Sequence, residues 1–260
     1  MQRSWACLAV ALFFTPSALA ADRADIGLAA SGARIEAAVV AGPSPSAPTV
    51  LIIGGMNGSD DATRFIHEAI RKHDSTRIDR RAFRLVAIPV VNPDRSRLVF
   101  PPTGAAYREN AESHALWRWM AIHAPDLVIV AGEDDGGLSG AMSEQRVAEV
   151  GWIPVRRVKS ARDVLSSVPK TIPSSGAHEE IDRRQRRTPQ QLADELADYY
   201  GHNFDQPTYL QGMALIGRMR LGQTESVAPL MAPYLDGQRD SLAKPNSLVL
   251  AGHLAFAELG

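Results

Sequence analysis

Short apolar runs alternate with helical patterns over residues 21–173 of this 260-residue chain. Four apolar runs have the character of strands: 35–40, 50–53, 83–91 and 126–132. An unbroken apolar run of this kind is typical of a strand that is covered on both faces. Between the runs, 62–72 and 112–124 carry apolar residues at helical spacing. Strands that alternate with helices predict an α/β unit with a mostly parallel sheet and flanking helices.

After residue 173 the pattern becomes purely helical. The polar stretch 174–188 reads as a linker, and Thr188 followed by Pro189 is a good helix start. Four helical segments follow, over 189–200, 209–221, 224–235 and 247–259. We expect them to form stacked helical hairpins. The last segment is strongly apolar and ends at Gly260 without a polar cap, which predicts that the pattern continues in relatives and is cut short here.

The first twenty residues have the pattern of a secretory signal peptide. Arg3 supplies the positive charge, 5–14 is apolar, and 18–20 is a small-residue cleavage site. The apolar stretch is about half of the ~20 residues that span a bilayer, so no stable membrane span is expected after cleavage. The alternative is a short anchor that stays attached. Cleavage would remove Cys7, the only cysteine, and leave a periplasmic or secreted protein without disulfides or thiolate ligands.

The amino-acid composition mainly argues against certain classes of partner. The chain is 45% hydrophobic and 22% charged, as in ordinary globular proteins, and its formal net charge is -1. That balance gives no electrostatic reason to expect a nucleic-acid partner. Four arginines cluster in the polar stretch, at 183, 184, 186 and 187, but no aromatic residues interleave with them. The cluster therefore reads as a solvated linker or helix start.

Polar residues that could carry chemistry follow the predicted strands, in the loops 54–60, 92–94 and 132–135. In a parallel sheet, ligands bind outside the carboxyl ends of the strands. The carboxylates at the end of the first loop and in the last one are Asp60, Asp61, Glu133, Asp134 and Asp135. Five carboxylates without an imidazole would favour calcium or magnesium if they held a metal. The alternative is that they cap a helix and solvate two loops.

The same loops carry a family resemblance. The series GGMNGSD, PVVNPDRSR, YREN and PDLVIVAGED, over about 50–133, resembles the zinc carboxypeptidase family, whose relatives include deacylases of N-acyl amino acids. The resemblance implies a carboxypeptidase-like α/β fold. It also implies that the zinc-binding His-x-x-Glu pair falls on Asn57 and Asp60 and the third ligand on Gly132. Arg108 and Asn110 would then bind the substrate carboxylate.

The departures from that family bear on function. Asparagine binds zinc far less well than imidazole, and Gly132 offers no side chain. We therefore expect an exported protein without zinc catalysis that binds a peptide, an amino acid or a glycan fragment at the strand-end loops. No cofactor is expected, and zinc would require altered ligands. The alternative is an active hydrolase with such ligands, whose catalytic residues and general base stay unassigned.

The helical segment has a resemblance of its own. Residues 197–237 look like the opening hairpins of six-hairpin glycosidases, notably unsaturated uronyl hydrolases. This resemblance implies that Asp205, Tyr209 and His253 face a sugar-binding cleft. About four helices cannot close the twelve-helix toroid of those enzymes. If the protein is an active hydrolase, it could thus also be part of such a glycosidase. The other interpretation is that the helical segment is a packing domain without a binding site.

Overall fold

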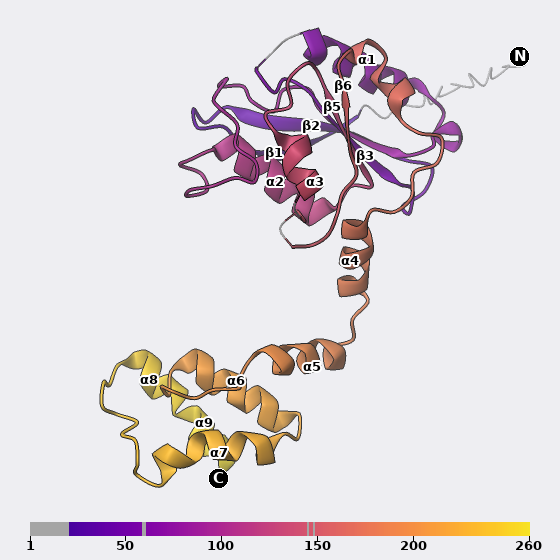
Figure 1. The fold of residues 1–260 in the computed structure, drawn as a ribbon. Coiled ribbons are helices and arrows are strands. Elements are labelled where there is room, and N and C mark those ends of the chain that lie inside the picture. Colours follow the sequence, from indigo (N-terminus) through magenta and orange to yellow (C-terminus); the bar gives the residue numbers. More distant parts are fainter. Residues whose placement is uncertain (1–20, 59–60, 145, 148) are drawn as a thin grey trace, which may run out of the picture. The chain divides into compact units, whose positions relative to one another are not determined.

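The computed structural model describes residues 21–58, 61–144, 146–147 and 149–260. The chain divides into two compact units, Met1–Asp182 and Arg183–Gly260, and Figure 1 traces both. The predicted signal peptide, 1–20, lies outside the described residues. In the described part of the chain, no helix is long and apolar enough to cross a membrane.

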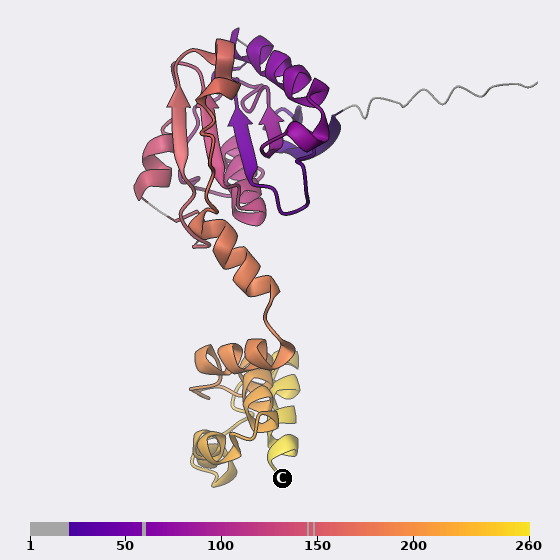
Figure 2. The same cartoon turned by 90° about the vertical axis from the view of Figure 1, so that its right-hand side faces the viewer.

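The first unit is built on a six-stranded sheet with the order β1-β2-β4-β3-β5-β6. Its strands are β1 (Asp22–Leu28), β2 (Arg34–Val40), β3 (Thr49–Ile53), β4 (Arg84–Ile88), β5 (Leu127–Ala131) and β6 (Val155–Val158). The pairs β4/β3, β3/β5 and β5/β6 are parallel, whereas β1/β2 and β2/β4 are antiparallel. Figure 2 shows strands of this sheet side by side with a common direction. The predicted α/β unit with a mostly parallel sheet is confirmed.

Helices cover both faces of the sheet, which explains the unbroken apolar strands. Along β3, Leu51 and Ile53 pack with α2 (Ala111–His123) and α3 (Leu138–Glu144). Val50 and Ile52 point the other way and pack with α1 (Asp61–Ser75) and the 3-10 helix η2 (Ala161–Ser167). All four strand residues have 0% of their surface exposed. Since successive side chains of a strand face opposite ways, only a sheet buried on both faces needs every position apolar.

Among the strands and α-helices before residue 174, β1, β6 and α3 were not predicted. β1 contains charged residues at 22, 23 and 25, and the four residues of β6 include two arginines, so neither strand forms an apolar run. Both lie at the edges of the sheet, where charged side chains reach solvent. α3 has only seven residues, too few for a helical period to stand out.

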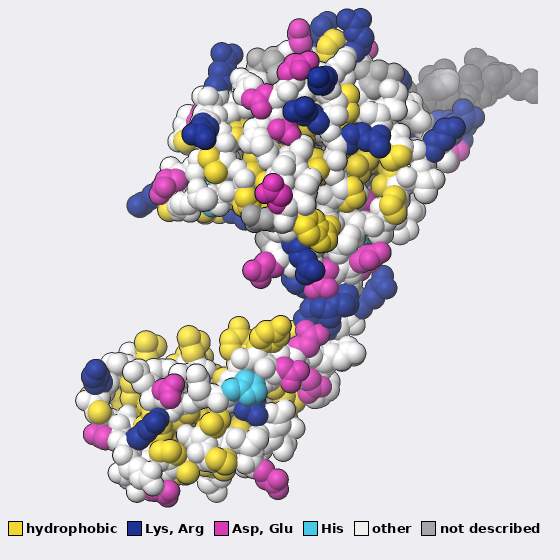
Figure 3. Space-filling view, viewed as in Figure 1, with side chains coloured by type: hydrophobic (Ala, Val, Ile, Leu, Met, Phe, Trp, Pro, Cys, Tyr) yellow, Lys and Arg dark blue, Asp and Glu magenta, His cyan; other side chains and the backbone are white. Residues whose placement is uncertain are grey.

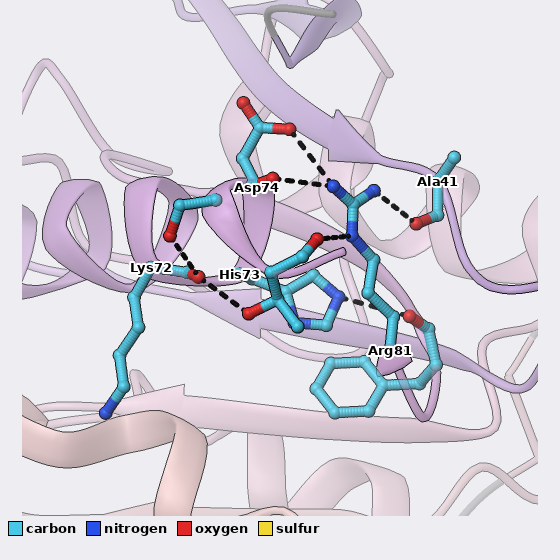
Figure 4. A network of polar contacts seen from close by, with 8 residues as sticks. Ala41, Lys72, His73, Asp74 and Arg81 are labelled. Carbon is cyan, nitrogen blue, oxygen red and sulfur yellow. Dashed lines mark hydrogen bonds and ion pairs between the residues drawn. The ribbon is translucent and has the colours of Figure 1, made fainter. Parts of the chain in front are cut away.

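A polar network fixes the end of α1 to its surroundings (Figure 4). The Arg81 guanidinium, just after the 3-10 helix η1 (Ile78–Arg80), donates to the carbonyl oxygens of Asp74, Thr76 and Ala41 at 2.6, 2.9 and 2.9 Å. It also lies 3.5 Å from the Asp74 carboxylate. The guanidinium thereby satisfies carbonyls that the end of a helix leaves without partners.

The second unit is wholly helical in its described secondary structure. Its helices are α5 (Pro189–Tyr199), α6 (Tyr209–Arg220), α7 (Thr224–Leu235), α8 (Ser247–Gly252) and α9 (Leu254–Leu259). Thr188 caps α5 as its sequence suggests: its side chain accepts the N–H of Gln191 at 3.2 Å, and the Gln191 side chain accepts the N–H of Thr188 at 2.9 Å. A small apolar core centres on Leu215, Val227 and Met231.

Two helical boundaries differ from the predicted ones. The stretch predicted as a linker contains α4 (Gly176–Gln185), which spans the boundary between the two units. The last predicted helix, 247–259, is divided at His253 into α8 and α9. There the N–H of His253 bonds to the carbonyl of Leu250, three residues back, at 3.2 Å. This tighter turn interrupts the α-helical ladder.

Candidate functional site

The strand order places a crevice between β3 and β5. The chain leaves β3 toward β4 on one side and leaves β5 toward β6 on the other. The loops after β3 and β5 therefore separate at the carboxyl edge of the sheet, which is the usual place for a ligand in an open parallel sheet. This is the edge at which the sequence predicted a site.

A cavity of about 470 Å³, which we call the strand-end pocket, opens at this edge. That volume lies in the range of small-molecule sites. Residues from the loops after β3, β5 and β6 and from the first turns of α1 line it: Met56, Asn57, Asp61, Ala62, Phe65, Ala131, Gly132, Glu133, Asp134, Lys159 and Ser160. The structure thus brings together two of the three positions that resemble zinc ligands, Asn57 and Gly132. The third, Asp60, lies outside the described residues.

The loop after β3 is held against the loop after β4. Gly55 has a φ of 58°, and a Cβ there would lie 2.7 Å from the Cα of Val90, so the close approach requires glycine. Asn92 has 0% of its surface exposed, and its side-chain amide donates to the carbonyls of Met56 and Ser96, both at 2.8 Å. The asparagine of the Asn-Pro-Asp turn therefore positions one wall of the strand-end pocket.

The other residues of that turn also have structural partners. Asp94 accepts from the backbone N–H of Ser31 at 2.7 Å and from its hydroxyl at 2.5 Å, which ties the β1–β2 turn to the turn after β4. Arg95, the residue that follows the turn, has a left-handed φ of 56°. The chain thus leaves the Asn-Pro-Asp turn through a left-handed residue that is not glycine.

Asn57 and Asp134 bridge the mouth of the crevice. The Asn57 side-chain amide donates to Asp134 Oδ2 at 3.2 Å. The N–H of Gly136 donates to the other carboxylate oxygen at 2.9 Å. These two hydrogen bonds, from Gly136 and then Asn57, hold the pKa of Asp134 below its ordinary value. Asp134 thus stays ionised to a lower pH than a free aspartate.

The Asp135 carboxylate has a different role from those of Glu133 and Asp134. It does not line the strand-end pocket and is 8% exposed. Its carboxylate accepts the N–H groups of Gly137 at 3.0 Å and Ser139 at 3.2 Å, at the start of α3. Burial opposes ionisation, but the hydrogen bonds from Ser139 and Gly137 and the charge of Arg157 outweigh it, so the pKa of Asp135 is lowered. This carboxylate caps a helix.

Asn57 and Gly132, the described residues at the positions that resemble zinc ligands, do not fit a tetrahedral zinc ion. The Asn57 NH2 group donates to Asp134, so a metal could only be offered the neutral carbonyl oxygen of that amide, which is a weak zinc ligand. The φ of Gly132 is 132°, a conformation that residues with side chains rarely adopt, so a histidine there would require the backbone to change. Within the described residues, no group of three His, Cys, Asp or Glu side chains lies close enough to hold a metal ion.

The two residues predicted to bind a substrate carboxylate lie elsewhere. Arg108 is exposed in the loop before α2, and Asn110 immediately precedes that helix. The Asn110 side chain donates to the carbonyl of Thr103 at 3.0 Å. Neither residue lines the strand-end pocket. The structure therefore does not group them with Asn57 and Gly132.

Lys159, Ser160 and Phe65 line the pocket but were not among the predicted site residues. Lys159 and Ser160 directly follow β6, the strand that has no apolar run. Phe65 lies in α1 beside two cations: the Arg64 guanidinium is 4.6 Å and the Arg162 guanidinium 5.7 Å from its ring centroid. The signal for Lys159 would have been its place after a strand, had β6 been recognised.

The residues implied by the glycosidase resemblance lie in the helical unit. Asp205 lines a second cavity and is 3.8 Å from Arg239. Tyr209, the first residue of α6, is 42% exposed and does not line that cavity. His253 stands between α8 and α9 and is half-buried. The three residues are thus not brought into one cavity lining.

No protein-family model matches the chain, and no curated protein matches it by sequence. Solved structures similar to it include a metallo-carboxypeptidase from Burkholderia cenocepacia, at 13% identity and a TM-score of 0.38, covering 58% of this chain and 52% of that one. Carboxypeptidase A from Helicoverpa armigera aligns at 14% identity and a TM-score of 0.34, over 65% of this chain and 58% of that one.

A third similar structure is a succinylglutamate desuccinylase/aspartoacylase from Rhodobacter sphaeroides, at 22% identity and a TM-score of 0.31. The alignment covers 43% of this chain and 38% of that one. The chain thus spans less than two thirds of the length of each of these three structures. Likeness at this level assigns no activity, so function has to be argued from the residues of the strand-end pocket.

Proposed function

We propose that the strand-end pocket binds a small ligand that carries an amine, an amino acid or a short peptide, and that it does so without zinc catalysis. The observation that carries this proposal is the lining of the pocket. Three carboxylates, Asp61, Glu133 and Asp134, share it with one ammonium group, that of Lys159. The described lining therefore has two negative charges in excess, which favours a cationic group on the ligand.

The charged residues also suggest an orientation. Asp61 follows β3, Glu133 and Asp134 follow β5, and Lys159 follows β6. Since β5 lies between β3 and β6, the acids occupy one side of the pocket and the lysine the other. A zwitterion would direct its ammonium group toward the acids and its carboxylate toward Lys159. The Gly136 N–H and then the Asn57 amide lower the pKa of Asp134 and so keep the acidic side charged.

A glycan fragment fits this lining less well than an amine does. Sugars are neutral and commonly stack on aromatic rings, and Phe65 is the only aromatic residue among those that line the pocket. The guanidiniums of Arg64 and Arg162 already lie near its ring. A neutral sugar would also gain nothing from the excess of carboxylates. We therefore favour the amino-acid or peptide ligand.

Calorimetric titration of the purified, EDTA-treated protein tests the proposal. The ligands are alanyl-alanine, N-acetyl-alanyl-alanine without the amine, and alanyl-alanine amide without the carboxylate. We expect the acetylated peptide to lose the most affinity. An exposed charge pair contributes up to about 1 kcal/mol, so Asp134→Asn should weaken alanyl-alanine binding about fivefold, and Glu133→Gln/Asp134→Asn should weaken it further.

The matched control is Asp25→Asn on β1, which removes an exposed carboxylate 3.6 Å from Arg34 and far in sequence from the pocket loops. It should leave the affinity unchanged. Absence of binding, or equal loss in the control and the pocket variants, would contradict the proposal. Hydrolysis of the peptide that depends on stoichiometric zinc would instead support the alternative, an active metallo-hydrolase with altered ligands.

We also propose that the protein is exported. The support is the n-region, apolar stretch and cleavage pattern of residues 1–20. N-terminal sequencing of the protein from the cell envelope fraction should give a chain that begins at Ala21. A chain that keeps its first twenty residues would favour the short anchor.

A further inference from the structure

The helical unit has its own cavity, of about 580 Å³, which we call the helical pocket. Its lining comes from the loop before α6, from α7, from the loop between α7 and α8, and from the start of α8: Asp205, Gln206, Pro207, Thr208, Tyr234, Arg239, Asp240, Ser241, Ala243, Lys244, Asn246, Leu248 and Val249. Acidic and basic side chains are balanced in it, with Asp205 and Asp240 against Arg239 and Lys244. The strand-end pocket shares no residue with it.

Ser241, in the wall of the helical pocket, is hydrogen-bonded to a histidine. Its Oγ lies 3.0 Å from His253 Nε2. The other ring nitrogen, Nδ1, lies 2.8 Å from the carbonyl oxygen of Val249. A carbonyl only accepts, so Nδ1 must carry the proton, and in a neutral imidazole Nε2 is then an acceptor. The Ser241 hydroxyl therefore donates to Nε2.

The position of the imidazole is set by its surroundings. His253 occupies the break between α8 and α9, one helical turn after Val249. Its ring also contacts Phe256, with the ring centroids 5.4 Å apart and the planes inclined at 49°. Backbone carbonyl, aromatic ring and serine thus hold one tautomer in one orientation. A hydroxyl, a base within hydrogen-bond reach and a third group that orients the base are the parts of an activated nucleophile.

We propose that Ser241 is a nucleophile activated by His253 and that it takes the acyl group of small carboxylic esters. In the first step Oγ forms a bond to the ester carbonyl carbon while Nε2 accepts the hydroxyl proton. The tetrahedral intermediate then expels the alcohol, which receives that proton. Water repeats the sequence on the acyl-serine, releasing the carboxylic acid and restoring the hydroxyl. Arg239 and Lys244 in the same lining favour the negative charge that develops on the carbonyl oxygen.

Labelling of the purified protein with a fluorophosphonate tests the pair, because the reagent modifies activated serines. We expect one adduct, located at Ser241 by peptide mass mapping. Ser241→Ala should abolish it, whereas Ser247→Ala, a nearby serine outside the pocket lining, should leave it unchanged. General-base assistance contributes about 10²–10⁴-fold, so His253→Gln should slow labelling at least about 100-fold.

Hydrolysis of p-nitrophenyl acetate gives a second measurement, which does not depend on whether the His253 variant folds. Wild-type protein should release p-nitrophenol faster than Ser241→Ala, with circular dichroism showing that both are folded. Equal rates, labelling that misses Ser241, or equal labelling in folded His253→Gln would overturn the proposal. Asp25→Asn on β1 changes a residue outside both pocket linings, so it should not affect either readout.

Discussion

The two units of the chain bury their apolar side chains very differently. In the α/β unit, helices cover both faces of the sheet, and large side chains such as Ile52, Leu116 and Ile129 have 0% of their surface exposed. The helical unit has a core of seven buried residues and leaves many large apolar side chains in contact with solvent: Leu192, Leu196, Tyr199, Tyr200, Tyr209, Leu210, Met213, Leu248, Leu250 and Leu254. Figure 3 shows apolar atoms gathered along one side of this unit.

An apolar pattern specifies an element more fully than it specifies the layer that covers it. Helical spacing of apolar residues predicts a helix, but it does not say what covers the helix. A sheet recruits covering layers on two sides, whereas a few short helices enclose little volume for their surface. The helical unit also contains a buried network of hydrogen bonds, which we call its polar centre. Arg218 donates to the carbonyl of Gly201, the side chain of Gln223 and the hydroxyl of Ser226 at 2.6, 2.8 and 2.9 Å.

The largest change in stability is expected between truncation of a buried leucine and truncation of an exposed one. Leu116→Ala, at 0% exposure in α2, should destabilise the α/β unit by about 2–5 kcal/mol because it leaves a cavity. Leu210→Ala, at 78% exposure in α6, should change stability by less than about 0.5 kcal/mol. Tryptophan fluorescence in urea measures the first, since residues 5, 117, 119 and 152 are the only tryptophans. Similar losses in both variants would break the comparison.

The next effect tests the polar centre of the helical unit. Arg218→Met removes three hydrogen bonds from a side chain that is 8% exposed, and should cost roughly 2–3 kcal/mol by leaving polar partners unsatisfied. Arg220→Met is the matched control on the same helix, where the guanidinium bonds Glu258 on the surface at 2.8 Å. Far-UV circular dichroism during urea denaturation measures the free energy of unfolding of both variants. If Arg220→Met costs as much as Arg218→Met, burial of the network is not the cause.

The smallest effect concerns pH. His73 is 6% exposed, stacks on Phe83 and donates from Nε2 to the Phe83 carbonyl at 3.1 Å. Burial is the main cause that lowers its pKa. A base with a lowered folded pKa stabilises the fold above its unfolded pKa, 6.5, and this contribution is lost as the pH falls through the folded value.

Urea titrations at pH 8 and pH 5 therefore should show a smaller loss of stability at low pH for His73→Gln than for wild type. His202→Gln supplies the comparison, since His202 is exposed in the helical unit and bonds only the carbonyl of Asp198 in the described hydrogen bonds. Its pH dependence should match wild type. An unchanged pH dependence in His73→Gln would show that His73 is not the titrating group.

The sequence predicted the fold class because the central strands are continuous apolar runs and the helices between them are amphipathic. It missed β6, whose arginines leave no apolar run, and with β6 it missed Lys159. The edge of the sheet that carries Asn57, Glu133 and Asp134 was predictable, since loops after parallel strands meet there. The pairing of Asn57 with Asp134 was not, because it joins positions 77 residues apart through side-chain geometry alone.

The different roles of the neighbouring carboxylates could not be predicted from the sequence either. Asp134 lines the strand-end pocket, whereas Asp135 caps α3, although both follow the same strand. Ser241 and His253 gave no recognisable motif. Their contact depends on the turn that separates α8 from α9, where a single helix was predicted.

The account depends most on an amine being held by carboxylates at the strand ends without a zinc ion. The direct measurement is calorimetric titration of alanyl-alanine into metal-stripped protein, repeated after addition of one equivalent of zinc, with the solution analysed for free alanine. We expect the same dissociation constant in both titrations and no alanine. Binding that appears only with zinc, accompanied by release of alanine, would contradict it.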